Sequence, residues 1–483
     1  MGFNKHANPI LIAIVLFLFI SVTGGHASTI NAKSASLAHV SIAISTADDG
    51  DTVMVPAGEV AWDSQLVITK NIQLIGAGSD KTLITATYES PTTNTSDSRC
   101  GLIYFNPDNP SASQTFRISG FLFDLDLNCG AVFMRNHSLT FQQVRIDNNI
   151  FKNTSDQRTI IVWGQFRGVI DSNNFDNTHS TISTYGSNKT SWDDLTYSFG
   201  TDETLFYEDN ILTNLKGCPH SGGAGGRYTA RYNTYTTNMS KGLHPWYDAH
   251  GNQATGNHSA MATEIYGNVL THSYAGSGAT LFYHRGGKAV VFDNSMTVAA
   301  SAAGVSIREE YDDATYQPPA TGPDGQPQHV SDSYYWNNIK TPDTLFTASV
   351  HQDYFHRANN IVNDPPVLVE NVTHWQQRDT FFDGAVGVIG SCGYLGGSAC
   401  TKSGIGRGSL NDRPSTCAEG VAYWATDAGG DWNRKNKTEN DGCLYKCTST
   451  NTWELYYIPY NYPHPLRGPN PPNLYGIEVT SYE

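Results

Sequence analysis

A short pattern of apolar and polar residues recurs along the middle of the chain. An apolar or aromatic residue is followed by two variable residues, an asparagine and, in most copies, a further apolar pair. Chance in an Asn-rich chain is the alternative explanation, and the apolar flanks of most copies argue against it. The asparagines of the eight copies are Asn149, Asn173, Asn210, Asn233, Asn268, Asn294, Asn338 and Asn360.

The spacing of these asparagines predicts a solenoid. Successive positions differ by 24, 37, 23, 35, 26, 44 and 22 residues. The short steps suit one coil of a right-handed parallel β-helix, in which each turn adds three short strands stacked about 4.8 Å from the last. An asparagine at the same place in each coil can bond the next through its side-chain amide and so satisfy polar groups within the turn. We therefore expect an all-β, right-handed parallel β-helix over residues 28–383.

The chain before the repeat predicts the first coils and a cap. Short apolar runs rich in β-branched and aromatic residues, bounded by Gly, Pro and Asn, predict strands at residues 52–55, 65–68, 72–75, 83–85, 102–105 and 116–123. Leu37, Val40 and Ile44 fall on one helical face between Ser36 and Gly50. A short amphipathic helix there would cover the strand edges that the first coil exposes.

Two segments carry a resemblance to a known fold family. Asp49-Gly-Asp-Thr-Val-Met-Val-Pro-Ala-Gly58, followed by Leu66-Val-Ile-Thr-Lys-Asn-Ile-Gln-Leu-Ile-Gly-Ala-Gly78, resembles the first coils of the pectin lyase-like β-helix superfamily. The resemblance continues as coil periodicity to about residue 370. It implies the fold and leaves the activity open, because that superfamily holds lyases, hydrolases, epimerases, esterases and non-catalytic adhesins.

The N-terminus predicts export. Lys5 and His6 precede the apolar run from Ile10 to Ile20, and Gly25-His26-Ala27 follows with small residues at a signal-peptidase site. The run is too short to span a bilayer, so residues 1–27 are expected to be a signal peptide and the mature protein to be secreted, extracellular, periplasmic or on the cell surface. No later stretch is long and apolar enough to be a membrane anchor.

The last hundred residues, 384–483, differ in composition. They are rich in Gly and aromatic residues and resemble the C-terminal segment of uncharacterised bacterial secreted β-helix proteins. We expect an end cap stapled by cysteines; the alternative is a small sugar-binding module that presents aromatic faces. A zinc site is the alternative use of these cysteines. It is less favoured, because Cys443 and Cys447 form only one close pair and no second Cys or His pair lies nearby at ligand spacing. The aromatic candidates are Trp424, Trp432, Trp453 and Tyr456.

Charge narrows the class of ligand. The net charge of −15 argues against nucleic acid, which needs a basic footprint. Residues 225–290 run against this trend, with five Lys or Arg and two acidic residues, and they hold five of the sixteen histidines. A local cationic patch suits a polyanion such as a uronic-acid polymer, although an ordinary solvated surface is the plainer interpretation.

This basic stretch supplies the candidate site. Proton abstraction beside a uronate carboxylate needs a cation to neutralise the carboxylate, a base, and in some reactions an acid. Asp248-Ala-His250 slightly resembles the Asp-Pro-His element of β-helix mannuronan epimerases, with Ala249 in place of the proline. The candidate catalytic residues are Arg231, Tyr247, Asp248, His250, His284, Arg285 and Lys288. The candidate substrate-binding residues are Arg227, Lys241, His244, Trp246, Glu264 and Tyr283.

Three longer steps of the repeat predict loops, near residues 178–200, 236–262 and 299–332, that would wall a groove if they left the same corner. Asp193-Asp194 and Asp312-Asp313 within them are possible calcium ligands, although such pairs are more often solvated; no other cofactor is indicated. The signatures of calcium-pectate lyases and of polygalacturonases are absent. We expect a lyase or epimerase-like enzyme on an acidic extracellular polysaccharide; the alternative is a non-catalytic glycan-binding, adhesin or structural surface protein.

Overall fold

The computed structural model describes residues 27–468, except 90–100, 155–157, 187–197, 238–244, 252–257, 274–279, 299–303, 311–328, 342–343, 346–347, 352–367, 386–400 and 436–438. The signal peptide expected at residues 1–27 lies outside this range but for Ala27, and it remains a prediction. Asn360, the last asparagine of the repeat, also lies outside it.

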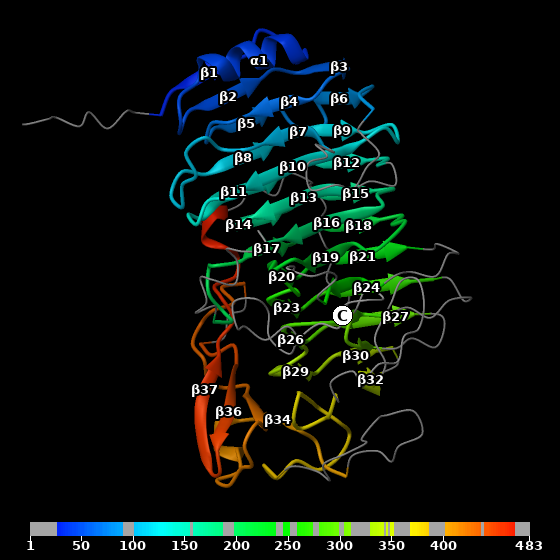
Figure 1. Cartoon of the computed structure of the whole chain (residues 1–483), viewed down its shortest axis with the longest axis vertical. Helices are drawn as coiled ribbons and strands as arrows, with labels where there is room; N and C mark the ends of the chain where they lie inside the picture. The colour runs from blue at the N-terminus through cyan, green and yellow to red at the C-terminus, as the bar shows by residue number, and fades with distance from the viewer. Residues whose placement is uncertain are drawn as a thin grey trace, which may run out of the picture.

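Three long sheets run side by side along the molecule and form a right-handed parallel β-helix (Figure 1). Sheet A consists of β1 (Thr29–Asn31), β2 (Thr52–Val55), β5 (Gln73–Gly76), β8 (Phe116–Ser119), β11 (Gln142–Asp147), β14 (Phe166–Asp171), β17 (Leu205–Glu208), β20 (Arg227–Arg231), β23 (Ala262–Tyr266), β26 (Lys288–Phe292), β29 (Ser333–Trp336) and β33 (His374–Gln376). Sheet B consists of β3 (Gly58–Trp62), β6 (Thr82–Ala86), β9 (Leu122–Asp124), β12 (Ile150–Lys152), β15 (Asn174–Asp176), β18 (Ile211–Thr213), β21 (Thr234–Thr237), β24 (Val269–His272), β27 (Ser295–Val298), β30 (Ile339–Lys340) and β31 (Thr344–Leu345). Sheet C consists of β4 (Leu66–Ile68), β7 (Gly101–Phe105), β10 (Gly130–Asn136), β13 (Arg158–Gly164), β16 (Ser180–Tyr185), β19 (His220–Gly223), β22 (Tyr247–Ala249), β25 (Phe282–His284), β28 (Val305–Ile307) and β32 (Ala348–Val350).

Each coil visits the sheets in the order A, B, C, and strands within a sheet are parallel, except that β31 turns back against β30. Side chains alternate between the interior and the outer face, as in any strand. On β13, Ile160 and Val162 belong to the central core, whereas Ile161 and Trp163 belong to a separate outer cluster. This alternation decides which of two neighbouring residues can meet a ligand.

The asparagine ladder is confirmed in the turn between sheets A and B. From Asn149 to Asn338, each side-chain nitrogen donates to the side-chain oxygen of the next asparagine over 2.8 to 3.1 Å. The same nitrogens also donate to backbone carbonyls, as Asn173 does to Ile146 at 2.8 Å. The residue before each ladder asparagine has a positive φ angle, even the bulky Tyr232 at 55°. A two-residue turn with one left-handed residue is therefore repeated in coil after coil.

The expected N-terminal cap is also confirmed. Helix α1 (Leu37–Thr46) starts at Ser36, whose hydroxyl accepts from the backbone nitrogen of His39 at 3.4 Å. The indole of Trp62 donates to the carbonyl of Ala35 at 3.0 Å, and this bond ties the chain before the helix to sheet B. In Figure 1 the helix lies across the first coil. In the described part of the chain, no helix has the length and apolarity needed to cross a membrane.

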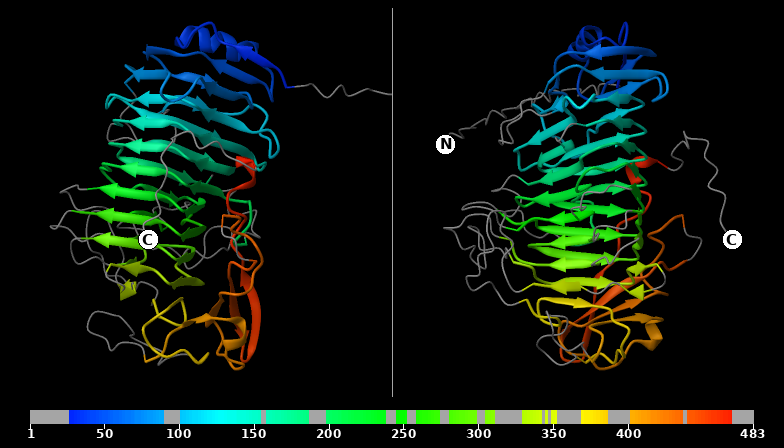
Figure 2. Two further views of the ribbon diagram at one scale, coloured as in Figure 1. Left: turned by 180° about the vertical axis from the view of Figure 1, so that it is seen from behind. Right: turned by 90° about the vertical axis from the view of Figure 1, so that its right-hand side faces the viewer.

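A smaller C-terminal sheet packs against the outer face of sheet A (Figure 2). Trp424 lies 5.1 Å from Phe292 and 5.1 Å from Trp336, centroid to centroid, and Trp432 is also buried. The predicted stapling is present as the disulfide Cys417–Cys447, which excludes a zinc site built on Cys443 and Cys447. The strands are β34 (Ile405–Gly408), β35 (Ala422–Ala425), β36 (Cys443–Ser449) and β37 (Thr452–Tyr457), with short 3-10 helices η1 (Leu410–Asp412) and η2 (Pro465–Arg467).

Residues 458–468, the C-terminal strap, then run back along sheet A toward earlier coils (Figure 2). Arg467 forms ion pairs with Asp171 at 3.0 Å and with Glu208 at 2.9 Å. Farther still, Arg145 on β11 donates to the carbonyl of Leu466 at 2.9 Å. The C-terminal segment thus covers the side of the coils, from β29 back to β11, as well as their end.

Candidate functional site

The predicted site residues separate onto different faces of the β-helix. Arg227, Arg231, Glu264 and Lys288 lie on sheet A, whereas Trp246, Tyr247 and His284 lie in the interior. Asp248, His250, Tyr283 and Arg285 belong to the outer side of sheet C or to the residues directly after its strands. Lys241 and His244 lie outside the described residues. Only the sheet C group is brought together on an outer face of the coils, where Asp248, His250 and Arg285 are themselves buried.

On sheet A, the C-terminal segment occupies the surface that the basic residues were expected to offer a ligand. Arg231 is fully buried, pairs with Glu208 at 2.7 Å and donates to the carbonyl of Asn461 at 2.8 Å. Glu264 accepts from the hydroxyl of Tyr457 at 2.8 Å. Arg227 is buried against Phe141 and Gln165. These three residues therefore hold the C-terminal segment or the coils in this structure, and we do not carry them into the proposed site.

Three other candidates are interior residues. The hydroxyl of Tyr247 donates to that of Tyr235 at 2.7 Å, and Trp246 packs edge-on against the same Tyr235. His284 contacts the hydroxyl of Tyr335 at 2.6 Å, and burial lowers the pKa of its imidazole to about 3. Because each of them points into the core, we remove them from the catalytic and substrate-binding candidates.

The remaining candidates form a charged group on sheet C together with Glu310, which we call the sheet C cluster: Asp248, His250, Arg285 and Glu310. Arg285 donates to Asp248 at 2.9 Å and forms a second ion pair with Glu310. One imidazole nitrogen of His250 lies 3.2 Å from Glu310 and the other lies 3.3 Å from Asp248. The guanidinium of Arg285 also lies 2.9 Å from the His250 ring. The imidazole can accept from Arg285 or donate to a carboxylate, according to its proton state.

Electrostatics hold Glu310 of this cluster in its ionised form. Burial works against ionisation of Glu310, but Arg285 and His250 outweigh it and lower the pKa of the carboxyl to about 2. Two carboxylates face one guanidinium, so the charge of Arg285 is already balanced by its neighbours. The cluster is therefore suited to fixing Arg285 rather than to offering a spare positive charge.

A small pocket of about 50 Å³ opens beside the cluster. It is lined by Tyr283, Arg285, Ser306, Arg308 and His351. Parallel register brings these residues together: Tyr283 lies opposite Ser306, and Arg308 and His351 each follow the neighbouring strands at the position that Arg285 takes after β25. Two guanidinium groups, a phenol and an imidazole thus converge on a space of the size of a carboxylate group.

Aromatic side chains continue the outer face of sheet C toward the N-terminal coils. Trp163 and Tyr185 are half-buried neighbours with ring centroids 5.2 Å apart, and Arg158 lies over the Tyr185 ring at 5.4 Å. Gly223 comes next in register, and a Cβ there would lie 3.3 Å from Tyr185 and 3.2 Å from His250. One line along the β-helix therefore joins the aromatic pair to the cluster and the pocket; we call it the sheet C line. Its members are Trp163, Tyr185, Gly223, His250, Arg285, Arg308 and His351.

Sequence reasoning missed Glu310, Arg308, His351, Trp163 and Tyr185. Arg308 and Glu310 lie just beyond the stretch singled out for its positive charge. The signal that could have found them is the coil repeat itself, because Arg285, Arg308 and His351 occupy the same place in three successive coils.

The expected loops and calcium ligands are largely outside the described residues, including Asp193, Asp194, Asp312 and Asp313. The chain order shows that all three longer steps include a connection from sheet C to sheet A: between β16 and β17, β22 and β23, and β28 and β29. That they form a groove wall remains a prediction. Among the described residues, no group of three or more His, Cys, Asp or Glu is arranged to hold a metal ion.

Comparison with known proteins adds solved structures of similar architecture. No protein-family model and no curated protein sequence matches the chain. A protein of Geobacillus virus E2, ORF18, has a TM-score of 0.40 at 12% identity, with 75% of this chain and 63% of that chain covered, less than two thirds of its length. The α-1,3-glucanase catalytic unit of Streptomyces thermodiastaticus has a TM-score of 0.37 at 11% identity, with 78% of this chain and 70% of that chain covered. The mannuronan C-5 epimerase AlgE4 A-module of Azotobacter vinelandii has a TM-score of 0.37 at 14% identity, with 67% of this chain and 92% of that chain covered.

These likenesses are distant, and the assignment of the fold rests on the three parallel sheets, the A-to-B asparagine ladder and the capping helix. The chain is a right-handed parallel β-helix. Within this β-helix, the outer face of sheet C is the described surface on which charged, proton-transferring and aromatic groups lie in one line.

Proposed function

We propose that the protein is a secreted enzyme that binds an acidic polysaccharide along the sheet C line and removes a proton from one of its uronic-acid units. The observation that carries the proposal is the pocket in which Arg285, Arg308, Tyr283 and His351 meet. A carboxylate is the anionic group that two guanidinium groups bind best, and phenol and imidazole are groups that transfer protons.

Arg308 and Arg285 have different roles in this proposal. Arg285 is held by Asp248 and Glu310, so it forms a fixed wall of the pocket. Arg308 follows one coil later and is the group that we assign to the uronate carboxylate. By neutralising the carboxylate, it makes the proton on the adjacent carbon more acidic and stabilises the enolate that forms when the proton leaves.

The proton passes to Tyr283 or His351, which line the same pocket. The electron pair left on carbon then takes one of two courses. In elimination it forms a carbon–carbon double bond, while the glycosidic oxygen leaves and takes up a proton. In epimerisation a proton returns to the opposite face of the same carbon. The two courses share the base and the carboxylate site, and the pocket is suited to both.

The aromatic pair supports binding of a chain rather than of a single sugar. Trp163 and Tyr185 lie on the same line as the pocket, several coils away. Aromatic rings present an apolar face to sugar rings, and strands about 4.8 Å apart place such groups regularly along the axis. We assign these two rings to binding sugar units remote from the reacting one.

The test is ultraviolet absorbance of the mature protein mixed with alginate, pectate or glycosaminoglycans, with proton–deuterium exchange at the uronate carbon followed by NMR. We expect one acidic glycan to give a rising absorbance or exchange. Arg308→Ala should lower the rate by ~10²–10³-fold, as removal of one charge-stabilising donor commonly does. Thr297→Ala, at an exposed position of sheet B, is the matched control. The enzyme proposal would be contradicted if no acidic glycan gave either a rise in absorbance or proton–deuterium exchange.

A second candidate is a non-catalytic glycan-binding protein. The observation that favours it is the mutual pairing of the sheet C cluster, which leaves Arg285 balanced within the protein. It predicts binding of acidic glycans without absorbance or exchange, weakened by Trp163→Ala. A catalytic rate that falls in Tyr283→Phe or His351→Ala, with binding retained, would exclude it.

A further inference from the structure

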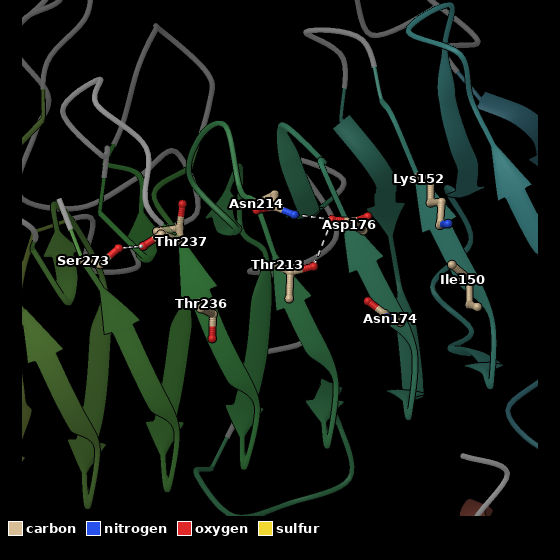
Figure 3. A pocket seen from close by; sticks show the side chains of 9 residues that line it. All are labelled: Ile150, Lys152, Asn174, Asp176, Thr213, Asn214, Thr236, Thr237 and Ser273. Atoms are coloured by element: carbon tan, nitrogen blue, oxygen red, sulfur yellow. Dashed lines mark hydrogen bonds between the residues drawn. The ribbon is translucent and has the colours of Figure 1, made fainter. Parts of the chain in front are cut away.

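A second groove lies on sheet B, away from the sheet C cluster. It has a volume of about 580 Å³ and crosses β12, β15, β18, β21 and the residue after β24 (Figure 3). Five strands at about 4.8 Å spacing give it a length of about 19 Å along the axis. Its lining residues are Ile150, Lys152, Asn174, Asp176, Thr213, Asn214, Thr236, Thr237 and Ser273.

The register of sheet B makes this lining repetitive. Lys152, Asp176, Thr213 and Thr236 lie opposite one another on successive strands. Thr236 and Ser273 are exposed, and Figure 3 shows the side chains along one side of neighbouring strands. A ligand that repeats along its own length therefore meets a polar side chain at each coil, whereas a compact ligand would use only part of the groove.

The groove differs in chemistry from the sheet C line. Its charges are one ammonium, Lys152, and one carboxylate, Asp176, which cancel. The other polar groups are hydroxyls and amides, which donate and accept hydrogen bonds as sugar hydroxyls do. None of its described lining residues is aromatic or an arginine. This lining suits an uncharged, hydroxyl-rich chain better than a polyanion.

Two details indicate a preorganised binding surface. Asp176 accepts from Asn214 at 2.7 Å and from Thr213 at 3.0 Å, so three lining side chains are fixed relative to one another. Within the described part of the chain, the amide oxygen of Asn174 has no hydrogen-bond partner. A buried acceptor without a partner is unfavourable, and a ligand hydroxyl would satisfy it only after the Asn174 side chain turns toward the groove.

We propose that the sheet B groove binds an uncharged polysaccharide and so attaches the protein to a neutral glycan while the sheet C line acts on an acidic one. This goes beyond the proposed function, because it assigns a second ligand class to a separate face. No chemistry is assigned to the groove; it binds and does not react.

Affinity electrophoresis of the mature protein in gels containing a soluble β-glucan, a galactomannan or a xylan tests this proposal. We expect at least one neutral glycan to retard the protein. Thr236→Arg and Thr213→Arg, which fill the groove from half-buried or exposed positions, should weaken the binding by about tenfold or more. Thr297→Arg adds the same side chain to an exposed position of the same sheet outside the groove, and it should leave the retardation unchanged.

Arg308→Ala separates this proposal from the proposed function, because it alters the sheet C pocket alone. Retardation by the neutral glycan should persist in this variant. The groove proposal is overturned if no neutral glycan retards the protein, if Thr236→Arg behaves as Thr297→Arg does, or if Arg308→Ala abolishes the retardation. Thermal melts of each variant check that the coils remain folded.

Discussion

Single residues in this protein are held chiefly by residues one coil away. A ladder asparagine such as Asn210 uses its whole amide: the nitrogen donates to Asn233 and to the carbonyl of Ile170, and the oxygen accepts from the nitrogens of Asn173. Because the group is buried, nothing else replaces these bonds when the side chain is removed.

We expect Asn210→Ala to lower the free energy of unfolding by about 2–4 kcal/mol, since it leaves buried donors and acceptors of two coils without partners. Denaturant titration would measure the loss. Asn31→Ala, at an exposed position of the edge strand β1, is the matched control and should change stability by less than about 0.5 kcal/mol. A ladder variant no less stable than the control would show that the ladder does not stabilise the fold.

The sequence predicts the ladder, but it does not predict which strand residues point into the core and which point outward. A local motif with eight copies reveals the turn, whereas the face that a residue occupies depends on its place in a strand. Tyr247 and Asp248 are adjacent, yet one lies in the core and the other pairs with Arg285 on the outside. Counting charges along residues 225–290 could not separate the two faces, because a one-residue shift exchanges them.

Among the elements, the coils were predictable and the C-terminal sheet was not. Hydrophobic runs and the helical face of Leu37, Val40 and Ile44 predict the first coils and α1 from local pattern alone. The C-terminal sheet packs through Trp424 onto Phe292 and Trp336, more than eighty residues earlier in the chain. The same tryptophan was a candidate for stacking on sugar, and an isolated sequence cannot distinguish a ring that binds a ligand from one that binds its own chain.

We expect the Cys417→Ser/Cys447→Ser variant to destabilise this sheet. The disulfide closes a loop of 30 residues, which in the chain-entropy treatment contributes roughly 3–4 kcal/mol. Limited proteolysis should cleave first between β34 and β37, and the coils should melt after this segment is lost. Unchanged proteolysis would show that packing on sheet A is sufficient to hold the sheet.

The whole molecule combines a stack of coils with a C-terminal segment that packs along the outer face of sheet A. Each coil contacts chiefly the next, so a bare stack would unfold from its ends in steps. The C-terminal sheet and the strap add bonds to distant coils. Tyr456 of the C-terminal sheet donates to Asp332 before β29, and Leu466 of the strap accepts from Arg145 on β11. Coils joined in this way should unfold together.

Buried histidines make this whole unit sensitive to acid. Burial lowers the pKa of His220, His284 and His374 to about 3, below the value of about 6.5 expected in the unfolded chain. The folded protein therefore binds fewer protons than the unfolded one between these values. The contribution of these histidines to the free energy of unfolding is fully present above about pH 6.5. It is lost as the pH falls toward 3, by about 1.4 kcal/mol per pH unit for each histidine.

Melting temperatures measured between pH 7 and pH 4.5 would test this expectation. This range lies above the ordinary pKa of most carboxyl groups, so the histidines are the main groups that titrate in it. His220→Phe, which keeps a ring between Tyr207 and Tyr247, should reduce the slope by the share of one histidine. A melting temperature that stays constant over this range would contradict the expectation.

The strap also has a consequence in time. The coils can form one after another as the chain is synthesised, because each needs only its predecessor. Arg467 and the residues around it are made after every coil that they join. During synthesis the stacked coils therefore lack the C-terminal sheet and the strap, and sheet A still exposes Phe292, Trp336 and their neighbours. During that interval the exposed apolar side chains favour aggregation with other chains, until the C-terminal sheet and the strap cover them.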